Sequence, residues 1–282
     1  MIGGLGLSAF LYCPKSDHYL RRSWQSDWPE REWRRLRELA AHASESGVLF
    51  GVGLSPYALY DNYGNREREA LRNKVERLNA LGAPLLALLF DDMPGEIEDL
   101  ASRQSEIVAD LLCWTESERV LVCPTYYSDD PVLEKHFGKR PSGYWEQLGA
   151  QLARDVDLFW TGPQVCSDTI TARDLEPVVQ QLQRPLVLWD NYPVNDGAVR
   201  SKHLYLDPLA GRDPDIREHL SGHLCNPMNQ AWLSLPALCG LATLYGHKPK
   251  EDWLAQVLGE HTLALIRRDA HRFLERGLDG LG

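Results

Sequence analysis

Short apolar segments alternate with amphipathic segments along almost the whole chain. The apolar segments predict β-strands at 8–13, 49–54, 84–90, 120–123, 158–160, 185–189 and 223–225, and the segments between them predict helices at 29–46, 67–81, 98–115, 144–154, 173–182 and 230–245. This alternation is typical of parallel strands joined by crossover helices. No GxGxxG motif follows the first strand, which disfavours a dinucleotide-binding sheet. With 282 residues, the chain fits an α/β fold of the (β/α)8-type TIM barrel.

The domain organisation follows from the same pattern. No linker or low-complexity segment interrupts the chain. We therefore predict a single catalytic-type barrel domain over residues 1–282. The apolar positions after Lys248 continue at helical spacing, so residues 248–282 are expected to form a C-terminal helical extension of that domain.

Charge and cysteine content exclude several classes of protein. The formal net charge is −10, which disfavours binding to nucleic acid. No apolar run approaches the length of a membrane span, and the N-terminus lacks the basic start of a secretory signal. The six cysteines show no CxxC spacing, so we predict reduced thiols in a cytoplasmic protein and no metal site.

Asp91 and Asp92 follow one another at the end of the apolar run 85–90. Six apolar residues between Gly-Ala-Pro and a Pro-Gly turn are typical of a buried parallel strand. Ionised carboxylates are costly to bury, so two in succession at this point are either turn and cap residues or a catalytic pair.

Polar side chains also follow most of the other predicted strands. In barrel enzymes the active site lies at the carboxyl ends of the strands, so these side chains are expected to converge. Each one alone has a structural explanation, such as a solvated turn lysine, a rim tyrosine, a core tryptophan or an asparagine in an Asx turn. Together with the two aspartates they suit a carbohydrate, which needs many hydrogen bonds and a flat apolar wall. The candidates are Lys15, Tyr127, Trp189, Asn191, Asp196 and Asn226.

Six short motifs carry a resemblance to a known family. In chain order they are LYCPKSD (11–17), LFDD (89–92), CPTYY (123–127), WTGP (160–163), WDN with ND (189–191, 195–196) and LCNP (224–227). Their order and spacing are similar to those of the catalytic barrel of the O-GlcNAcase family, the β-N-acetylglucosaminidases sometimes labelled hyaluronidase-like. The resemblance implies a retaining, substrate-assisted hydrolase that releases terminal β-linked N-acetylglucosamine from a glycan or glycoprotein and needs no cofactor.

The resemblance also implies roles for the candidate residues. Asp91 resembles the residue that orients the 2-acetamido group, and Asp92 resembles the general acid/base. Tyr127 resembles the tyrosine beside the acetamido group, and Trp189 resembles an aromatic wall. The residues that resemble the ligands of the sugar and its hydroxyls are Lys15, Asn191, Asp196 and Asn226. In such a mechanism the acetamido oxygen replaces the second carboxylate as nucleophile.

The sequence departs from the family pattern at its start. Family barrels begin with a strand that ends in a Gly-Phe-Tyr-Gly type motif, and no such motif occurs near the N-terminus. The barrel is therefore expected to be incomplete at the first strand, with an open seam. We expect the seam either to associate with another copy or to be filled by residues 1–7. An alternative function is a catalytically impaired sugar-binding or interaction protein, and a third is a barrel enzyme with other chemistry.

Overall fold

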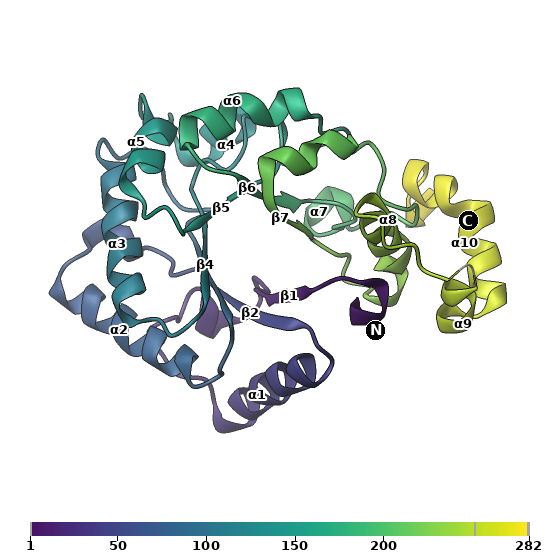
Figure 1. The fold of residues 1–282 in the computed structure, drawn as a ribbon, viewed down its shortest axis with the longest axis horizontal. Coiled ribbons are helices and arrows are strands. Elements are labelled where there is room, and N and C mark those ends of the chain that lie inside the picture. Colours follow the sequence, from purple (N-terminus) through teal and green to yellow (C-terminus); the bar gives the residue numbers. More distant parts are fainter. Residues whose placement is uncertain (1, 251, 281–282) are drawn as a thin grey trace.

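The computed structural model describes residues 2–250 and 252–280. Among these residues, seven parallel strands form one curved sheet, in which each strand is hydrogen-bonded to the next along the chain (Figure 1). The predicted strands are all present, and β7 begins at Leu220 rather than at His223. The strands are β1 (Ala9–Tyr12), β2 (Leu49–Leu54), β3 (Leu85–Leu89), β4 (Arg119–Cys123), β5 (Asp157–Trp160), β6 (Leu186–Asp190) and β7 (Leu220–Cys225).

Helices cover the outer side of this sheet (Figure 1). The six predicted helices are present. The sequence missed the seven-residue α4, whose first turn is capped by Asp130, and the four-residue α7. The helices around the sheet are α1 (Glu30–Glu45), α2 (Asn65–Asn79), α3 (Leu100–Trp114), α4 (Pro131–Phe137), α5 (Tyr144–Gln151), α6 (Ala172–Leu182), α7 (Gly197–Arg200) and α8 (Leu235–Leu244). Short 3-10 turns occur at Ile2–Leu5 (η1), His18–Leu20 (η2), Leu59–Asn62 (η3), Pro214–His219 (η4), Trp232–Ser234 (η5) and Leu278–Gly280 (η6).

Strand β3 shows why its apolar run folds as it does. All five residues are buried, because both faces of the strand are covered. Leu86 and Leu88 point outward into the core beneath the helices. Leu85, Ala87 and Leu89 point inward, into a cluster that fills the interior of the curved sheet. The alternation of faces follows from the two-residue period of a strand. Asp91 and Asp92 come after Phe90, at the end of this fully buried strand.

Gly53 of β2 lets the neighbouring strands approach one another. A Cβ atom at this position would lie 2.6 Å from the Cβ of Cys13 and 2.9 Å from Cδ1 of Leu89. Cys13, just after β1, and Leu89 of β3 therefore both approach β2 closely, because glycine leaves the space empty. Two residues further along each chain segment stand Lys15 and Asp91, so this close approach helps to bring the two together.

The sheet does not close into a barrel among the described residues. β1 pairs only with β2, and β7 pairs only with β6, so each leaves one edge unpaired. The residues 2–7 provide no strand there: Ile2–Leu5 is a 3-10 turn whose Leu5 packs with Cys239 and Ala242 of α8. The predicted filling of the seam by the N-terminus is therefore not found, and Met1 lies outside the described residues. The predicted incomplete α/β barrel is confirmed.

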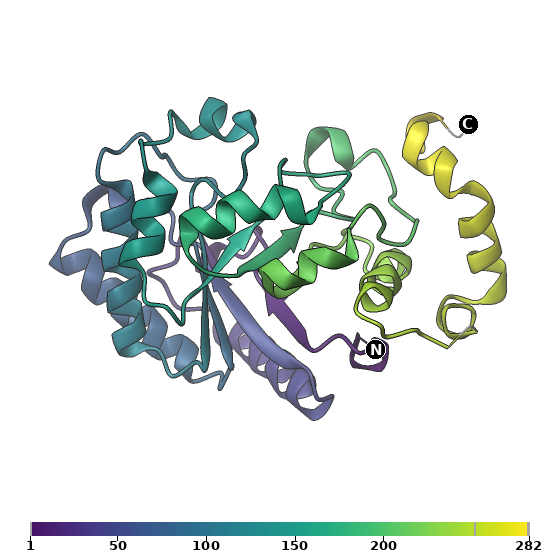
Figure 2. The same ribbon diagram turned by 45° about the horizontal axis from the view of Figure 1, so that its top comes forward.

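Helices α9 (Trp253–Leu258) and α10 (Glu260–Glu275) occupy the region predicted as a helical extension. They lie beyond α8, on the side of the molecule away from α2 and α3 (Figures 1 and 2). Ile266 and Ala270 of α10 pack on Leu204, Leu206 and Met228, so α10 covers the segments that follow β6 and β7. None of the described helices combines the length and the apolar character that crossing a bilayer would require.

Candidate active site

Asp91 and Asp92 follow β3 after the buried Phe90, and they point into different surroundings. The side chain of Asp91 is only 10% exposed and forms an ion pair with Lys15 through Oδ2. Its other oxygen, Oδ1, is buried and has no hydrogen-bond partner among the described residues. Burial around the ammonium lowers the pKa of Lys15, but the charges of Asp91 and Asp92 and the hydrogen bond to Asp91 together raise it by more, and the net pKa lies above its usual value. Lys15 is therefore held as a cation beside Asp91.

Asp92 turns outward because its backbone adopts the left-handed conformation, with φ of 58°. Aspartate tolerates this region better than most residues, although it costs about 1–2 kcal/mol relative to a right-handed conformation. The side chain of Asp92 is 45% exposed, and its Oδ2 lies 3.5 Å from Lys15 Nζ and 3.5 Å from Arg21 Nη2. The two successive carboxylates thus differ sharply in burial and in partners.

Tyr127 and Trp189 pack against the interior cluster of the sheet, above the inward side chains of the strands. The ring of Trp189 meets Phe159 edge-on, with 5.1 Å between ring centroids. Burial and the nearby Asp91 carboxylate raise the pKa of Tyr127 well above its usual value, so the phenol stays neutral and can donate a hydrogen bond. Both rings therefore lie at the interior cluster of the sheet, near the carboxyl ends of β4 and β6.

The two asparagines that follow β6 and β7 are in direct contact. Asn226 Nδ2 donates to Asn191 Oδ1 at 3.0 Å, and Asn191 Nδ2 donates to the carbonyl of Val165 at 2.7 Å. These two hydrogen bonds fix the orientation of both side-chain amides at the carboxyl ends of the neighbouring strands β6 and β7. The polar atoms of the two side chains that take no part in these bonds face away from them.

Asp196 is exposed at the N-cap position of α7 and makes no capping bond. No hydrogen bond or ion pair among the described residues joins it to the other candidates. Its neighbour Asn195 is buried, donates to Gln230 Oε1 at 2.9 Å and accepts from the amide of Asn229 at 3.0 Å. The loop that carries Asp196 is therefore tied to the loop after β7.

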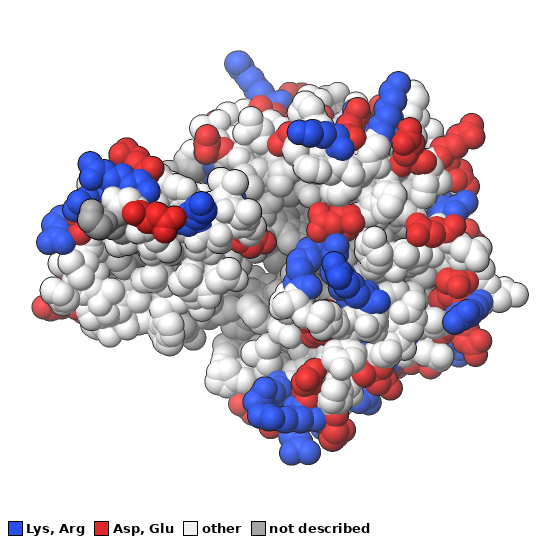
Figure 3. Space-filling model, turned by 180° about the vertical axis from the view of Figure 1, so that it is seen from behind, with Lys and Arg blue, Asp and Glu red and all other residues white. Residues whose placement is uncertain are grey.

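The face opposite that of Figure 1 carries acidic and basic side chains side by side, and Lys and Arg side chains gather next to a hollow near its middle (Figure 3). No group of three or more His, Cys, Asp or Glu residues in the described part of the chain is arranged to hold a metal ion.

Known proteins are similar to this chain in sequence and in fold. A family model described as beta-N-acetylglucosaminidase matches residues 1–264. The chain belongs to the β-N-acetylglucosaminidase family. It is 30% identical over 252 residues to the Protein O-GlcNAcase of Rattus norvegicus and 30% identical over 249 residues to that of Mus musculus. These matches cover 85% of this chain and only 26% of each relative.

One solved structure resembles an even larger part of this chain. A mutant of the Thermobaculum terrenum O-GlcNAc hydrolase superposes with a TM-score of 0.81 and 31% sequence identity, over 95% of this chain and 60% of that chain. The predicted O-GlcNAcase-like family is therefore confirmed, together with an α/β fold of the same kind.

The sequence did not reveal the buried ion pair between Arg212 and Asp190, which lies next to the two asparagines. Arg212 donates from Nε and Nη2 to the two oxygens of Asp190, both at 2.7 Å, and His223 Nε2 lies 3.1 Å from Asp190 Oδ2. Burial opposes the charge, but the hydrogen bonds from Arg212 and His223 hold the pKa of Asp190 below its usual value. Asp190 directly precedes Asn191, and its backbone carbonyl accepts a hydrogen bond from the backbone N–H of Asn226. The Asp190–Arg212 ion pair therefore supports the positions of both asparagines.

A second buried network supports the turn that carries the two aspartates. Thr125 donates to the carbonyl of Phe90 at 3.1 Å, and Gln104 donates to Thr125 at 2.9 Å. Tyr60 donates to the carbonyl of Pro94 at 2.6 Å. These bonds fix the backbone on both sides of the pair, as preorganised sites require. Of the three side chains in this network, only Thr125 lay in a motif that the sequence had singled out.

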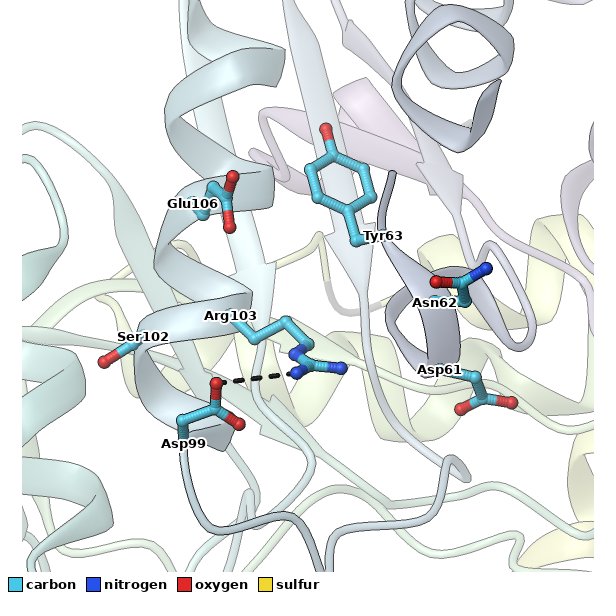
Figure 4. Close-up of a pocket in the computed structure, with 7 residues that line it drawn as sticks. All are labelled: Asp61, Asn62, Tyr63, Asp99, Ser102, Arg103 and Glu106. Carbon is cyan, nitrogen blue, oxygen red and sulfur yellow. Dashed lines mark hydrogen bonds and ion pairs between the residues drawn. The ribbon is translucent and has the colours of Figure 1, made fainter. Parts of the chain in front are cut away.

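Two cavities lie elsewhere, and neither is lined by any of the eight candidates. One, of about 380 Å³, lies between η3 and the first turns of α3, where the Arg103–Asp99 ion pair measures 3.5 Å (Figure 4). Another, of about 510 Å³, lies between the segment after β1 and helix α1. The first is lined by Asp61, Asn62, Tyr63, Asp99, Ser102, Arg103 and Glu106.

Proposed function

We propose that the chain hydrolyses terminal β-linked N-acetylglucosamine from a glycan or glycoprotein, with retention and with the substrate's own acetamido oxygen as nucleophile. The buried Oδ1 atom of Asp91 carries this proposal, because it lacks a hydrogen-bond donor among the described residues. A buried carboxylate oxygen without a partner is costly, and an acetamido N–H would supply the missing donor.

The proposed roles of the two acids follow from their surroundings. Asp91, paired with Lys15, accepts the acetamido N–H and stabilises the positive charge that develops on the acetamido group as its oxygen attacks the anomeric carbon. Asp92 is the more exposed, so it protonates the leaving oxygen and then activates the water that opens the oxazoline. Such a division needs no metal and no organic cofactor.

The remaining candidates bind the sugar in this proposal. Tyr127 donates its neutral hydroxyl near the acetamido group, and Trp189 forms a wall of the pocket. The polar groups that bind the hydroxyls of the sugar are Lys15, Asn191, Asp196 and Asn226. Asp196 would reach the sugar from the loop that Asn195 anchors.

We further propose that the chain acts in the cytoplasm, because its six cysteines are all free and a reducing compartment preserves free thiols.

An aryl N-acetylglucosaminide and the matching aryl glucoside test the function. We expect the first to be hydrolysed and the second not, because a glucoside lacks the acetamido nucleophile. Release of the aryl alcohol is measured for both, and the anomer formed first is identified by NMR. Comparable hydrolysis of the two sugars would exclude the substrate-assisted mechanism. Tight binding of a thiazoline mimic of the oxazoline without hydrolysis would favour the sugar-binding alternative.

We also propose that two copies associate through the open seam. Within residues 2–250 and 252–280, β1 and β7 each present an unpaired edge, and exposed edges invite pairing. Phe10 of β1 is 37% exposed, so Phe10→Lys should shift the protein towards the monomer. Leu265 of α10 is exposed to the same extent, and Leu265→Lys is the matched control. Light scattering across a concentration series measures the mass. A monomer at all concentrations, or equal effects of both substitutions, would exclude the seam as an interface.

A further inference from the structure

We infer that Arg21 and Tyr57 form a binding site for the leaving group, and that this site selects aglycones that carry a carboxylate. This inference rests on the proposed function, since it uses Asp92 as the acid that protonates the leaving oxygen. The aglycone must then extend from Asp92 towards solvent. Arg21 is the charged side chain that lies 3.5 Å from Asp92 Oδ2 in addition to Lys15.

Hydrogen bonds to the end of β2 hold Arg21 in place. It follows the turn η2, its Nη1 donates to Ser55 Oγ at 2.9 Å, and the amide of Ser55 donates to the carbonyl of Leu20 at 2.8 Å. Ser55 itself is buried at the end of β2. The guanidinium is therefore fixed before any ligand arrives, which reduces the entropy that binding would cost.

The bonds of Arg21 leave much of its donor capacity unused among the described residues. A guanidinium carries five N–H donors in a planar fork. Ser55 takes one of them at normal length, and Asp92 lies at 3.5 Å, which is the outer limit of a hydrogen bond. A carboxylate on the ligand could accept two donors at once from such a fork.

The charge balance changes when Asp92 carries the proton that it must deliver. In the resting site, Lys15 and Arg21 face Asp91 and Asp92, so two positive charges meet two negative ones. Lys15 keeps its partner Asp91 after Asp92 is protonated, whereas Arg21 loses its counter-charge. An anionic group on the aglycone would restore the balance while Asp92 stays protonated. A carboxylate near the leaving oxygen therefore suits this site better than a neutral group.

Tyr57 adds an exposed flat surface beside Arg21. Its side chain is 47% exposed, and the Arg21 guanidinium carbon lies 6.0 Å from the centre of its ring. Its backbone carbonyl accepts from Trp24 Nε1 at 3.3 Å, which holds the segment in place. A sugar or aryl ring of the aglycone could stack on Tyr57 while its carboxylate meets Arg21.

The test compares 3-carboxyphenyl β-N-acetylglucosaminide with its methyl ester, which has the same ring but no charge. We expect kcat/KM to be roughly tenfold higher for the acid in the unmodified protein, as for a hydrogen bond between charged partners at a partly exposed site. Arg21→Met should bring the acid-to-ester ratio to about one, whatever it does to the absolute rates. Tyr57→Ala should lower kcat/KM for both substrates and leave their ratio unchanged.

Arg22 supplies the matched control, because it is the neighbouring arginine and is exposed. Arg22→Met removes the same charge and should keep the preference for the acid. Equal rates for acid and ester in the unmodified protein, or a preference that survives Arg21→Met or disappears in Arg22→Met, would overturn the inference alone. If neither substrate is hydrolysed, the proposed function fails. The affinities of the corresponding S-linked pair, measured by calorimetry, then decide whether Arg21 selects the carboxylate.

Discussion

Replacing Asp92 with asparagine is expected to lower kcat/KM by about 10²–10⁴-fold for N-acetylglucosaminides with poor leaving groups, and far less for activated aryl glycosides. The reason is that an activated aryl alcohol leaves without a proton from the protein. Asparagine also tolerates the left-handed backbone at this position, so the turn should be preserved. Rates are measured for a series of aryl glycosides and plotted against the pKa of the leaving alcohol.

Asp91→Asn should instead lower the rates of all substrates by a similar factor. The new amide places a donor near the buried position of Oδ1, where the acetamido group also needs an acceptor, and it removes the charge that pairs with Lys15. Asp61→Asn, an exposed aspartate in the cavity of Figure 4, is the control and should change nothing. The assignment would be wrong if Asp91→Asn and Asp92→Asn showed the same dependence on the leaving group.

The strands and the larger helices could be predicted because each has a local pattern of apolar residues. The run that became β3 is apolar over its whole length, and the structure buries it on both faces. The position of the two aspartates followed from the end of that run. Helix α4 was missed because seven residues span only two turns, too few for a periodic pattern.

The contacts that organise the site could not be read from local patterns. Arg212 reaches Asp190 from an irregular segment 22 residues away, and His223 reaches it from the next strand. Arg21 lies just after a 3-10 turn, where no periodicity marks it. The outward turn of Asp92 depends on a single backbone angle. Sequence therefore indicated which strand ends carry polar residues, and the structure showed which of them are paired.

Asp190→Asn is expected to reduce the free energy of unfolding by about 3–5 kcal/mol, because it leaves Arg212 buried without its counter-charge. Arg119→Met breaks the more exposed pair between Arg119 and Asp157 and should cost about 1 kcal/mol or less. Urea unfolding of the three proteins at neutral pH measures the difference. Equal losses in the two variants would show that burial adds nothing to the Asp190–Arg212 pair.

The pH dependence of that difference follows from the lowered pKa of Asp190. A carboxyl whose folded-state pKa is depressed stabilises the fold above its unfolded value, here about 3.8, and this contribution disappears as the pH falls through the folded-state pKa. The difference in the free energy of unfolding between the unmodified protein and Asp190→Asn should therefore be largest at neutral pH and shrink as the pH drops below 3.8. Asp190 precedes Asn191, and its backbone carbonyl accepts from the backbone N–H of Asn226. Asp190→Asn should therefore also raise KM more than it lowers kcat. A gap that persists unchanged in acid would show that the loss comes from packing rather than from the charge of Asp190.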